Sequence, residues 1–86
     1  MLARVTHGKL LLDRLDRPKD ALAQFDAYLE AKPKGTLAEE ALAGRARAYR
    51  AMDRGAQELA AWRDLLDAYP DGVHAQAAKT RLGESD

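Results

Sequence analysis

An internal repeat of 37 residues limits the folds that this chain can adopt. When the sequence is shifted by that length against itself, apolar residues fall on apolar residues and turn residues fall on turn residues. The matched pairs are Leu12/Tyr49, Leu15/Met52, Asp16/Asp53, Arg17/Arg54, Leu22/Leu59, Phe25/Trp62, Leu29/Leu66, Pro33/Pro70, Gly35/Gly72, Ala38/Ala75 and Ala41/Ala78. Such self-similarity is typical of arrays in which each unit buries its apolar face against the next.

Turn-forming residues divide the repeat into helical lengths. Proline, glycine and aspartate cluster at 16–18, 32–35, 53–55 and 70–72, and the segments between them favour helix. The expected helices are 2–15, 18–32, 36–52, 55–69 and 73–83. Only five residues are β-branched, too few for a sheet of ordinary size. We therefore predict an all-α fold of five helices, joined by short loops into antiparallel hairpins.

Local signals refine the expected helix starts. Thr36 and Glu39 have the spacing of a capping box, in which each side chain satisfies a free backbone N–H. Asp16 and Asp53 precede the second and fourth expected helices, where a carboxylate can act as an N-cap.

The repeat carries a recognisable set of residues in each unit. The first unit has Ala21, Phe25 and Pro33, the second has Ala46, Tyr49, Trp62 and Pro70, and Leu82-Gly83 opens a third. These residues resemble the tetratricopeptide repeat (TPR) family. The resemblance implies one domain over 1–86, a short α-solenoid with unit 1 at about 2–33, unit 2 at about 36–70 and a partial third unit or capping helix at about 73–83. Lys9 and Glu58 depart from the family pattern, because they occupy places where it has small residues.

The period is longer than the usual 34 residues, and the extra length follows the Tyr69-Pro70 turn. This form resembles a sub-class found in bacterial envelope proteins, including Tol-associated division-coordination proteins and outer-membrane assembly lipoproteins. The resemblance implies part of a larger bacterial protein in the periplasm or envelope, and a cytoplasmic location stays open. The N-terminus lacks the apolar stretch of a signal peptide, so any export signal is expected outside this sequence.

Members of the family hold a peptide or protein partner in a concave groove lined by the first helix of each unit. Carried over position by position, the partner-binding residues are Leu10, Asp13, Arg14, Glu40, Ala43, Arg47, Arg50, Ala77 and Thr80. The three arginines form a modestly basic strip that suits an acidic or C-terminal peptide. The alternative is that these arginines are simply a solvated face.

The structural core is expected on the apolar faces of the first four helices, which neighbouring units bury for one another. Its predicted members are Leu12, Ala21, Leu22, Phe25, Leu29, Ala46, Tyr49, Leu59, Trp62 and Leu66. Two full units are fewer than the roughly three that stable arrays need. Apolar surface is therefore expected to stay uncovered around Leu2, Val5 and Leu11 at one end and Val73 and Leu82 at the other. This supports either a fragment of a longer array or, as the alternative function, a self-associating domain that forms a homo-oligomer.

Composition excludes several other functions. Fourteen basic residues balance fourteen acidic ones, which argues against a nucleic-acid or membrane-surface binder. No apolar run is long enough to insert into a membrane. His7 and His74 are far apart and no cysteine is present, so neither a metal site nor a cofactor is expected. No nucleophile and base fall into a catalytic pattern, and the chain is predicted not to be an enzyme.

Overall fold

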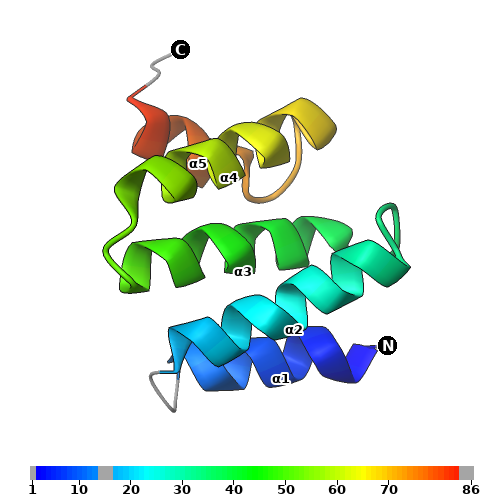
Figure 1. Cartoon of the computed structure of the whole chain (residues 1–86). Helices are drawn as coiled ribbons and strands as arrows, with labels where there is room; N and C mark the ends of the chain where they lie inside the picture. The colour runs from blue at the N-terminus through cyan, green and yellow to red at the C-terminus, as the bar shows by residue number, and fades with distance from the viewer. Residues whose placement is uncertain (1, 14–16, 84–86) are drawn as a thin grey trace.

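Five α-helices make up the regular structure of this protein. The computed structural model describes residues 2–13 and 17–83, without the side chains of residues 2–4 and 13. The helices are α1 (Leu2–Asp13), α2 (Pro18–Ala31), α3 (Ala38–Ala51), α4 (Gly55–Ala68) and α5 (Ala75–Leu82) (Figure 1). No strand occurs in these residues, so the all-α prediction with five helices is confirmed. None of the described helices has the length and apolar character needed to cross a bilayer.

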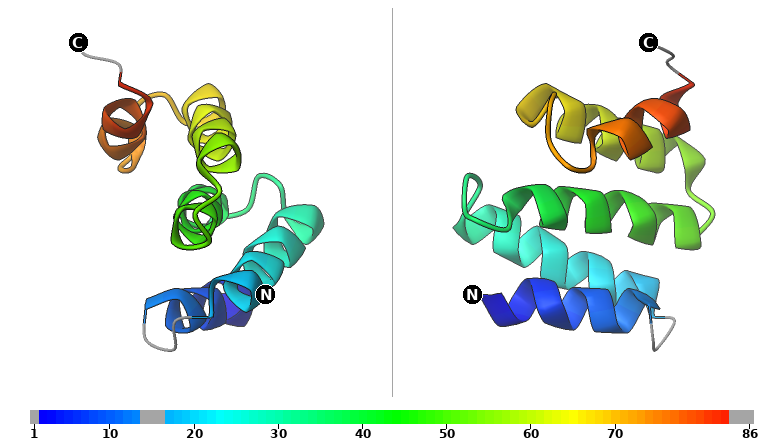
Figure 2. Two further views of the ribbon diagram at one scale, coloured as in Figure 1. Left: turned by 60° about the vertical axis from the view of Figure 1, so that its left-hand side comes forward. Right: turned by 180° about the vertical axis from the view of Figure 1, so that it is seen from behind.

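The third helix, α3, lies at the centre of the packing. Each helix packs on the next in the chain, and α1 also contacts α3. The Cα atoms of α3 and α5 stay more than 8 Å apart, so only side chains and the loop before α5 connect these two helices. In the left view of Figure 2, α3 lies between the α1–α2 pair and the α4–α5 pair. In that view α1 lies to the left of α2 and α5 lies to the left of α4, so α1 and α5 are on the same side of the molecule.

Hydrogen bonds at the helix ends repeat with the period of the sequence. The backbone N–H groups of Ala21, Lys32, Gly35, Ala38 and Ala41 donate to the carbonyls of Arg17, Tyr28, Lys32, Gly35 and Leu37. Those of Glu58, Tyr69, Gly72, Ala75 and Ala78 donate to the carbonyls of Arg54, Leu65, Tyr69, Gly72 and His74, each 37 residues further on. The backbone angles agree as well: Lys32 has φ −140° and ψ 71°, and Tyr69 has φ −136° and ψ 67°. The two units therefore share one backbone design.

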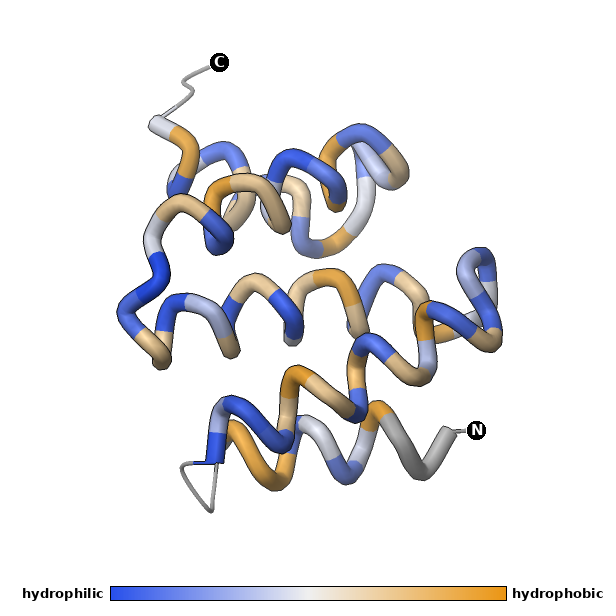
Figure 3. Tube along the Cα trace, in the orientation of Figure 1, coloured by the Kyte–Doolittle hydropathy of each residue, from blue (hydrophilic) through white to orange (hydrophobic). Residues whose placement is uncertain are grey.

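Two apolar clusters form the core, one on each side of α3. Along the tube in Figure 3, apolar and hydrophilic stretches alternate within the helices. The first joins α1, α2 and the start of α3, and it contains Val5, Leu11, Ala21, Phe25, Tyr28, Ala38 and Ala41. The second joins the rest of α3 to α4 and α5, and it contains Ala43, Ala46, Ala61, Trp62, Leu65, Leu66, Ala75 and Ala78. Small residues dominate α3 because it is packed on more than one side.

Most predicted core residues lie in or against these clusters. Ala21, Phe25, Ala46, Trp62 and Leu66 are buried, Leu12, Leu29 and Tyr49 are partly buried against a cluster, and Leu22 is partly buried. Leu59 is 41% exposed, so its assignment to the core was wrong. Its place in the repeat matches Leu22, which is itself not fully buried, because this row of the second helices lies at the border of the core.

The expectation of an uncovered N-terminal end was also wrong. Val5 and Leu11 are buried, since α1 turns them toward Phe25 and Tyr28 of α2. The side chain of Leu2 is outside the described residues. At the other end Val73 is 82% exposed, as expected, whereas Leu82 is partly buried against the second cluster.

Two glycines allow helices to close on the Phe25 ring. A Cβ atom added to Gly8 of α1 would lie 2.9 Å from Cε1 of this ring. One added to Gly44 of α3 would lie 2.5 and 2.6 Å from Cε1 and Cε2. Real Cβ atoms do not approach a ring so closely, and the ring is fully buried. Glycine at both positions therefore sets how tightly α1 and α3 pack against α2.

Of the predicted side-chain caps, the two that fall on described residues do not form. The residue preceding α3 is Leu37, and no side chain caps this helix, so the Thr36–Glu39 capping box was wrong. The N-cap of α4 is Arg54, while Asp53 has a positive φ of 60° in the turn that ends α3. Asp16 lies outside the described residues.

Other acceptors take the place of these caps. The N–H of Leu37 donates to the Tyr28 hydroxyl at 3.0 Å, and the equivalent N–H of His74 donates to Oε2 of Glu39 at 2.9 Å. Tertiary contacts thus satisfy the N–H group before α3, where a capping box was expected, and the equivalent N–H group before α5.

Candidate partner-binding face

Side chains of α3 define two different faces of the molecule. Glu40 reaches α1 and the start of α5, since its carboxylate lies 2.9 Å from Nζ of Lys9 and 2.9 Å from Nε2 of His74. Arg45 reaches the second helices instead. Its guanidinium lies 3.1 Å from Oδ1 of Asp26 on α2 and 3.7 Å from Oδ2 of Asp64 on α4. One side of α3 therefore belongs with α1 and α5, and we call it the candidate face.

The predicted binding residues are distributed unevenly over the candidate face. Leu10, Arg47, Arg50, Ala77 and Thr80 are exposed, and Glu40 is partly buried by its ion pairs. Asp13 belongs to α1, but its side chain is not described, and Arg14 lies outside the described residues. Ala43 is 2% exposed and belongs to the second core cluster, so it cannot contact a ligand. The resemblance to the TPR family placed it in the groove, whereas residues of α4 and α5 pack against it in the second core cluster.

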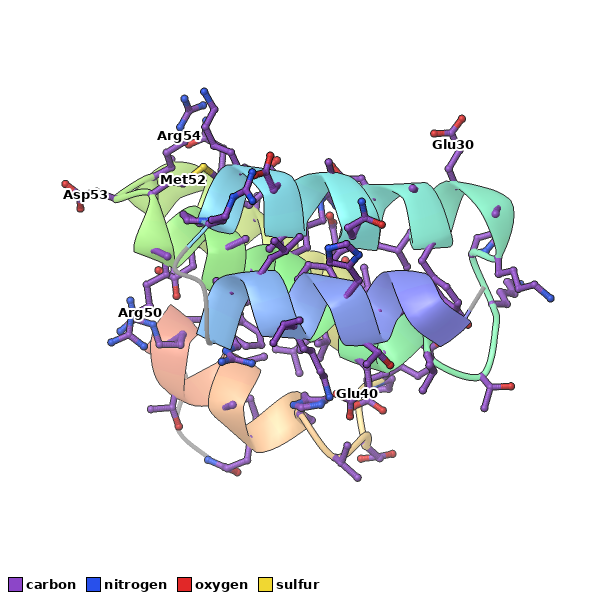
Figure 4. All side chains as sticks on the ribbon, turned by 90° about the horizontal axis from the view of Figure 1, so that it is seen from below. Glu30, Glu40, Arg50, Met52, Asp53 and Arg54 are labelled. Carbon is purple, nitrogen blue, oxygen red and sulfur yellow. The ribbon has the colours of Figure 1, made fainter. Side chains whose placement is uncertain are left out.

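A recess opens on this face where α1 and α3 end. It has a volume of about 360 Å³ and is lined by Leu12, Arg47, Arg50 and Ala51. Residues 40, 43, 47 and 50 follow the helical spacing that places them along one side of α3. Glu40 lies near the start of α3 and Arg50 near its end. Figure 4 shows Arg50 beside the ends of α1 and α5. The recess therefore joins two of the predicted arginines with an apolar wall.

The carboxylate of Glu40 is stabilised in its charged form. Hydrogen bonds from Lys9 and then from His74 hold the pKa of Glu40 below its usual range, although burial acts in the opposite direction. These contacts connect the first helices across the candidate face, because Lys9 belongs to α1 and His74 precedes α5. Lys9, a departure from the TPR pattern, thus has a structural partner.

Glu58 is the second departure from that pattern, and it is buried at 2% exposure. Its carboxylate accepts a hydrogen bond from Nε1 of Trp62 at 2.9 Å. It also accepts two from Arg81 of α5, from Nε at 2.8 Å and from Nη2 at 2.9 Å. The Arg81 hydrogen bonds are the main reason why the pKa of Glu58 lies below its usual range. A buried carboxylate is stable here because charged and neutral donors satisfy both oxygens.

The repeat shows what this pair replaces. Residues 37 positions before Glu58 and Arg81 are Ala21 and Gly44, which are both buried. Two small residues let α2 and α3 approach closely, whereas a charged pair bridges α4 and α5 at the equivalent place. Glu58 was expected to depart from the family pattern, but Arg81 was not predicted as its partner. The signal was the simultaneous change of both small residues at one step of the repeat.

On the opposite side of α3, Arg45 links α2 to α4. Its guanidinium carbon also lies 5.8 Å from the centroid of the Tyr49 ring, within cation–π range. Burial raises the pKa of Asp26, and the positive charge of Arg45 opposes this shift. A second recess, of about 610 Å³, lies away from the candidate face between Pro33, Lys34, Ala68 and Tyr69.

The two histidines do not meet. His7 is exposed on α1, and His74 is held by the glutamates of α3. Among the described residues no group of three or more histidine, cysteine, aspartate or glutamate side chains has the arrangement of a metal site.

Comparison with known proteins gives no assignment: no family model matches the chain, and no curated protein or solved structure matches it either.

Proposed function

We propose that this chain is a protein-interaction module, a short TPR-like α-solenoid that holds a peptide or protein partner on the candidate face. In this proposal it is part of a larger bacterial protein, has no catalytic role and carries no cofactor. Fold alone does not determine function, so the proposal depends on the site.

One observation carries the proposal: the two units share their backbone hydrogen bonds, and their first helices lie on one side. Equivalent residues of α1, α3 and α5 then form a continuous surface, as in stacked helical repeats. The residues predicted for that surface include exposed apolar and charged side chains, among them Leu10 at 46% exposure and the two arginines of the recess. Ligand sites typically combine an apolar surface with a few polar groups of this kind.

The test uses two leucines with nearly equal exposure. Leu10 belongs to α1 and Leu59 to α4, at 46% and 41% exposure. Peptides would be selected from a random-sequence library against the whole chain, and their binding sites mapped by amide chemical shifts. We expect shifts along α1, α3 and α5, and weaker binding by Leu10→Asp than by Leu59→Asp. Peptides that map to α2 and α4, or that lose affinity equally with both variants, would contradict the proposal.

Self-association is the second candidate, and Val73 favours it because a valine so exposed gains by being covered. The burial of Val5 and Leu11 removes most of the apolar surface expected at the N-terminal end. Light scattering at several concentrations separates the two functions. A mass of one chain at every concentration supports the interaction module, and a mass that rises with concentration supports self-association, which Val73→Ser would then reduce.

A further inference from the structure

The recess on the candidate face has an unusual combination of walls. Arg47 and Arg50 come from successive turns of α3, and Leu12 comes from α1. Both arginines are exposed, and Leu12 is partly buried against the first core cluster. A guanidinium has five N–H donors, so it can hold an incoming acceptor in addition to a partner on its own chain.

Charge is divided along this side of α3. At the N-terminal end, Glu40 is neutralised by Lys9 and can also pair with His74. Seven and ten residues further on come Arg47 and Arg50, roughly 10 and 15 Å along the helix. This separation is about one Debye length or more at 0.1 M salt. The negative charge of Glu40 therefore offsets little of the positive charge of the two arginines. The positive charge of Arg50 also reaches Glu58, where it contributes to lowering the pKa of that carboxyl.

The spacing of the two guanidinium groups limits what they can hold. They lie three residues apart, on neighbouring turns, and each planar fork can take a carboxylate through two parallel hydrogen bonds. Two guanidinium groups one helical turn apart can each bind a carboxylate, so a ligand with two carboxylates fits them better than a ligand with a single carboxylate. Alternate side chains of an extended peptide point to the same side roughly 7 Å apart, a separation that long arginine side chains can span.

We infer that the recess binds an acidic segment of a partner protein, with two acidic side chains at alternate positions followed by an apolar residue on the same side. The carboxylates pair with Arg47 and Arg50, and the apolar side chain contacts Leu12. This inference rests on the proposed function, since it names the ligand class of the candidate face. Acidic side chains fit better than a chain terminus because a terminus supplies a single carboxylate.

The experiment uses the whole chain and the peptide Gly-Glu-Ser-Glu-Ser-Leu-Gly, blocked at both ends and labelled for fluorescence anisotropy. Three comparison peptides carry glutamine for both glutamates, serine for leucine, or a free C-terminal carboxylate. We expect the glutamine peptide to bind at least tenfold more weakly and the serine peptide severalfold more weakly. The peptide with a free carboxylate should bind within about threefold of the blocked one. Affinity should fall with added salt, as it does for charge pairs at a surface.

Two double variants with the same change in net charge give the matched comparison. Arg47→Glu with Arg50→Glu should lower the affinity at least tenfold. Lys19→Glu with Arg54→Glu alters exposed cations away from the recess and should change it less than threefold. Circular dichroism of both variants would show that the helices are retained.

Several results would overturn the inference. Equal losses in the two double variants would mean that the peptide senses only net charge. Equal binding of the glutamine peptide would remove the role of the carboxylates, and tenfold tighter binding of the free-terminus peptide would identify a chain end as the ligand. If library peptides without acidic residues bind α1, α3 and α5 while the acidic probe does not, this inference fails and the proposed function stands.

Discussion

Replacing Gly44 by alanine tests the packing of the first core cluster most sharply. In the interior of a solvent-exposed helix this substitution raises the free energy of unfolding by about 1 kcal/mol, because glycine is a poor helix former. Here the new methyl group would lie 2.5 Å from Cε1 of Phe25, a ring with no exposed surface and with Gly8 against it. Overpacking of this kind costs about 1–3 kcal/mol. Gly44→Ala is therefore expected to lower the free energy of unfolding by up to about 2 kcal/mol instead of raising it.

Gly55 provides the matched control for this substitution. It lies exposed at the start of α4, and a Cβ atom added there meets nothing within 4 Å. Gly55→Ala should therefore leave the free energy of unfolding unchanged or raise it by up to about 1 kcal/mol. Urea unfolding followed by circular dichroism measures both variants. The reasoning is refuted if Gly44→Ala stabilises the protein as much as Gly55→Ala does.

A double variant identifies the ring as the cause. Phe25→Leu leaves a smaller side chain in the buried site, so in the Gly44→Ala background it should cost less than in the wild type. We expect a coupling free energy of about 1 kcal/mol between the two positions. Additive effects would mean that the clash is relieved elsewhere.

Three further predictions concern the second unit and the ion pairs. Trp62→Ala should lower the free energy of unfolding by about 3–5 kcal/mol, against less than about 1 kcal/mol for Leu59→Ala, and a loss below about 1 kcal/mol in urea melts for Trp62 would show that the repeat alignment is wrong. Trp62→Phe keeps a ring but removes the donor to Glu58, and should cost about 1–2 kcal/mol in the same assay. Because the pKa of Glu40 is lowered in the folded state, its contribution is present at neutral pH and is lost as the pH falls through that lowered value. The stability difference between wild type and Glu40→Gln, about 1 kcal/mol or less, should therefore vanish at acid pH, and a difference that persists at pH 2 would contradict the ion-pair explanation.

The sequence predicted the helices well because their limits depend on local chemistry. Pro18 begins α2 at the residue expected, and the Pro33 and Pro70 turns separate the later helices within a few residues of the predicted ends. Backbone hydrogen bonds around the Pro33 and Pro70 turns also repeat at the 37-residue shift, where proline and glycine recur at equivalent positions. Periodicity cannot specify which side of a helix a neighbour covers. For this reason Leu59 was placed in the core. Val5 was expected to be uncovered because the chain has only two full units, but α2 packs against it.

The candidate site was less accessible from the sequence because its contacts are long-range. Glu39 was assigned to a local cap, but its carboxylate accepts a hydrogen bond from the backbone of His74, 35 residues away. The partner of Glu58 is 23 residues away on a different helix. Arg47 and Arg50 were expected on this face because of the resemblance to the TPR family. Leu12, predicted as a core residue, became visible as the wall of the recess only through the packing of α1 on α3.

If the repeated sequence places equivalent side chains in stacked helical hairpins, the Phe25 ring of α2 lies against both Gly8 of α1 and Gly44 of α3. Nuclear Overhauser effects between the Phe25 ring and the Hα atoms of the two glycines measure this packing. In each glycine one Hα atom takes the direction of the missing Cβ atom, which would lie against the ring. We expect strong Overhauser effects between the ring and both glycines, and between the Trp62 indole N–H and the Glu58 side chain. A Phe25 ring close to only one of the two glycines, or to neither, would contradict this packing.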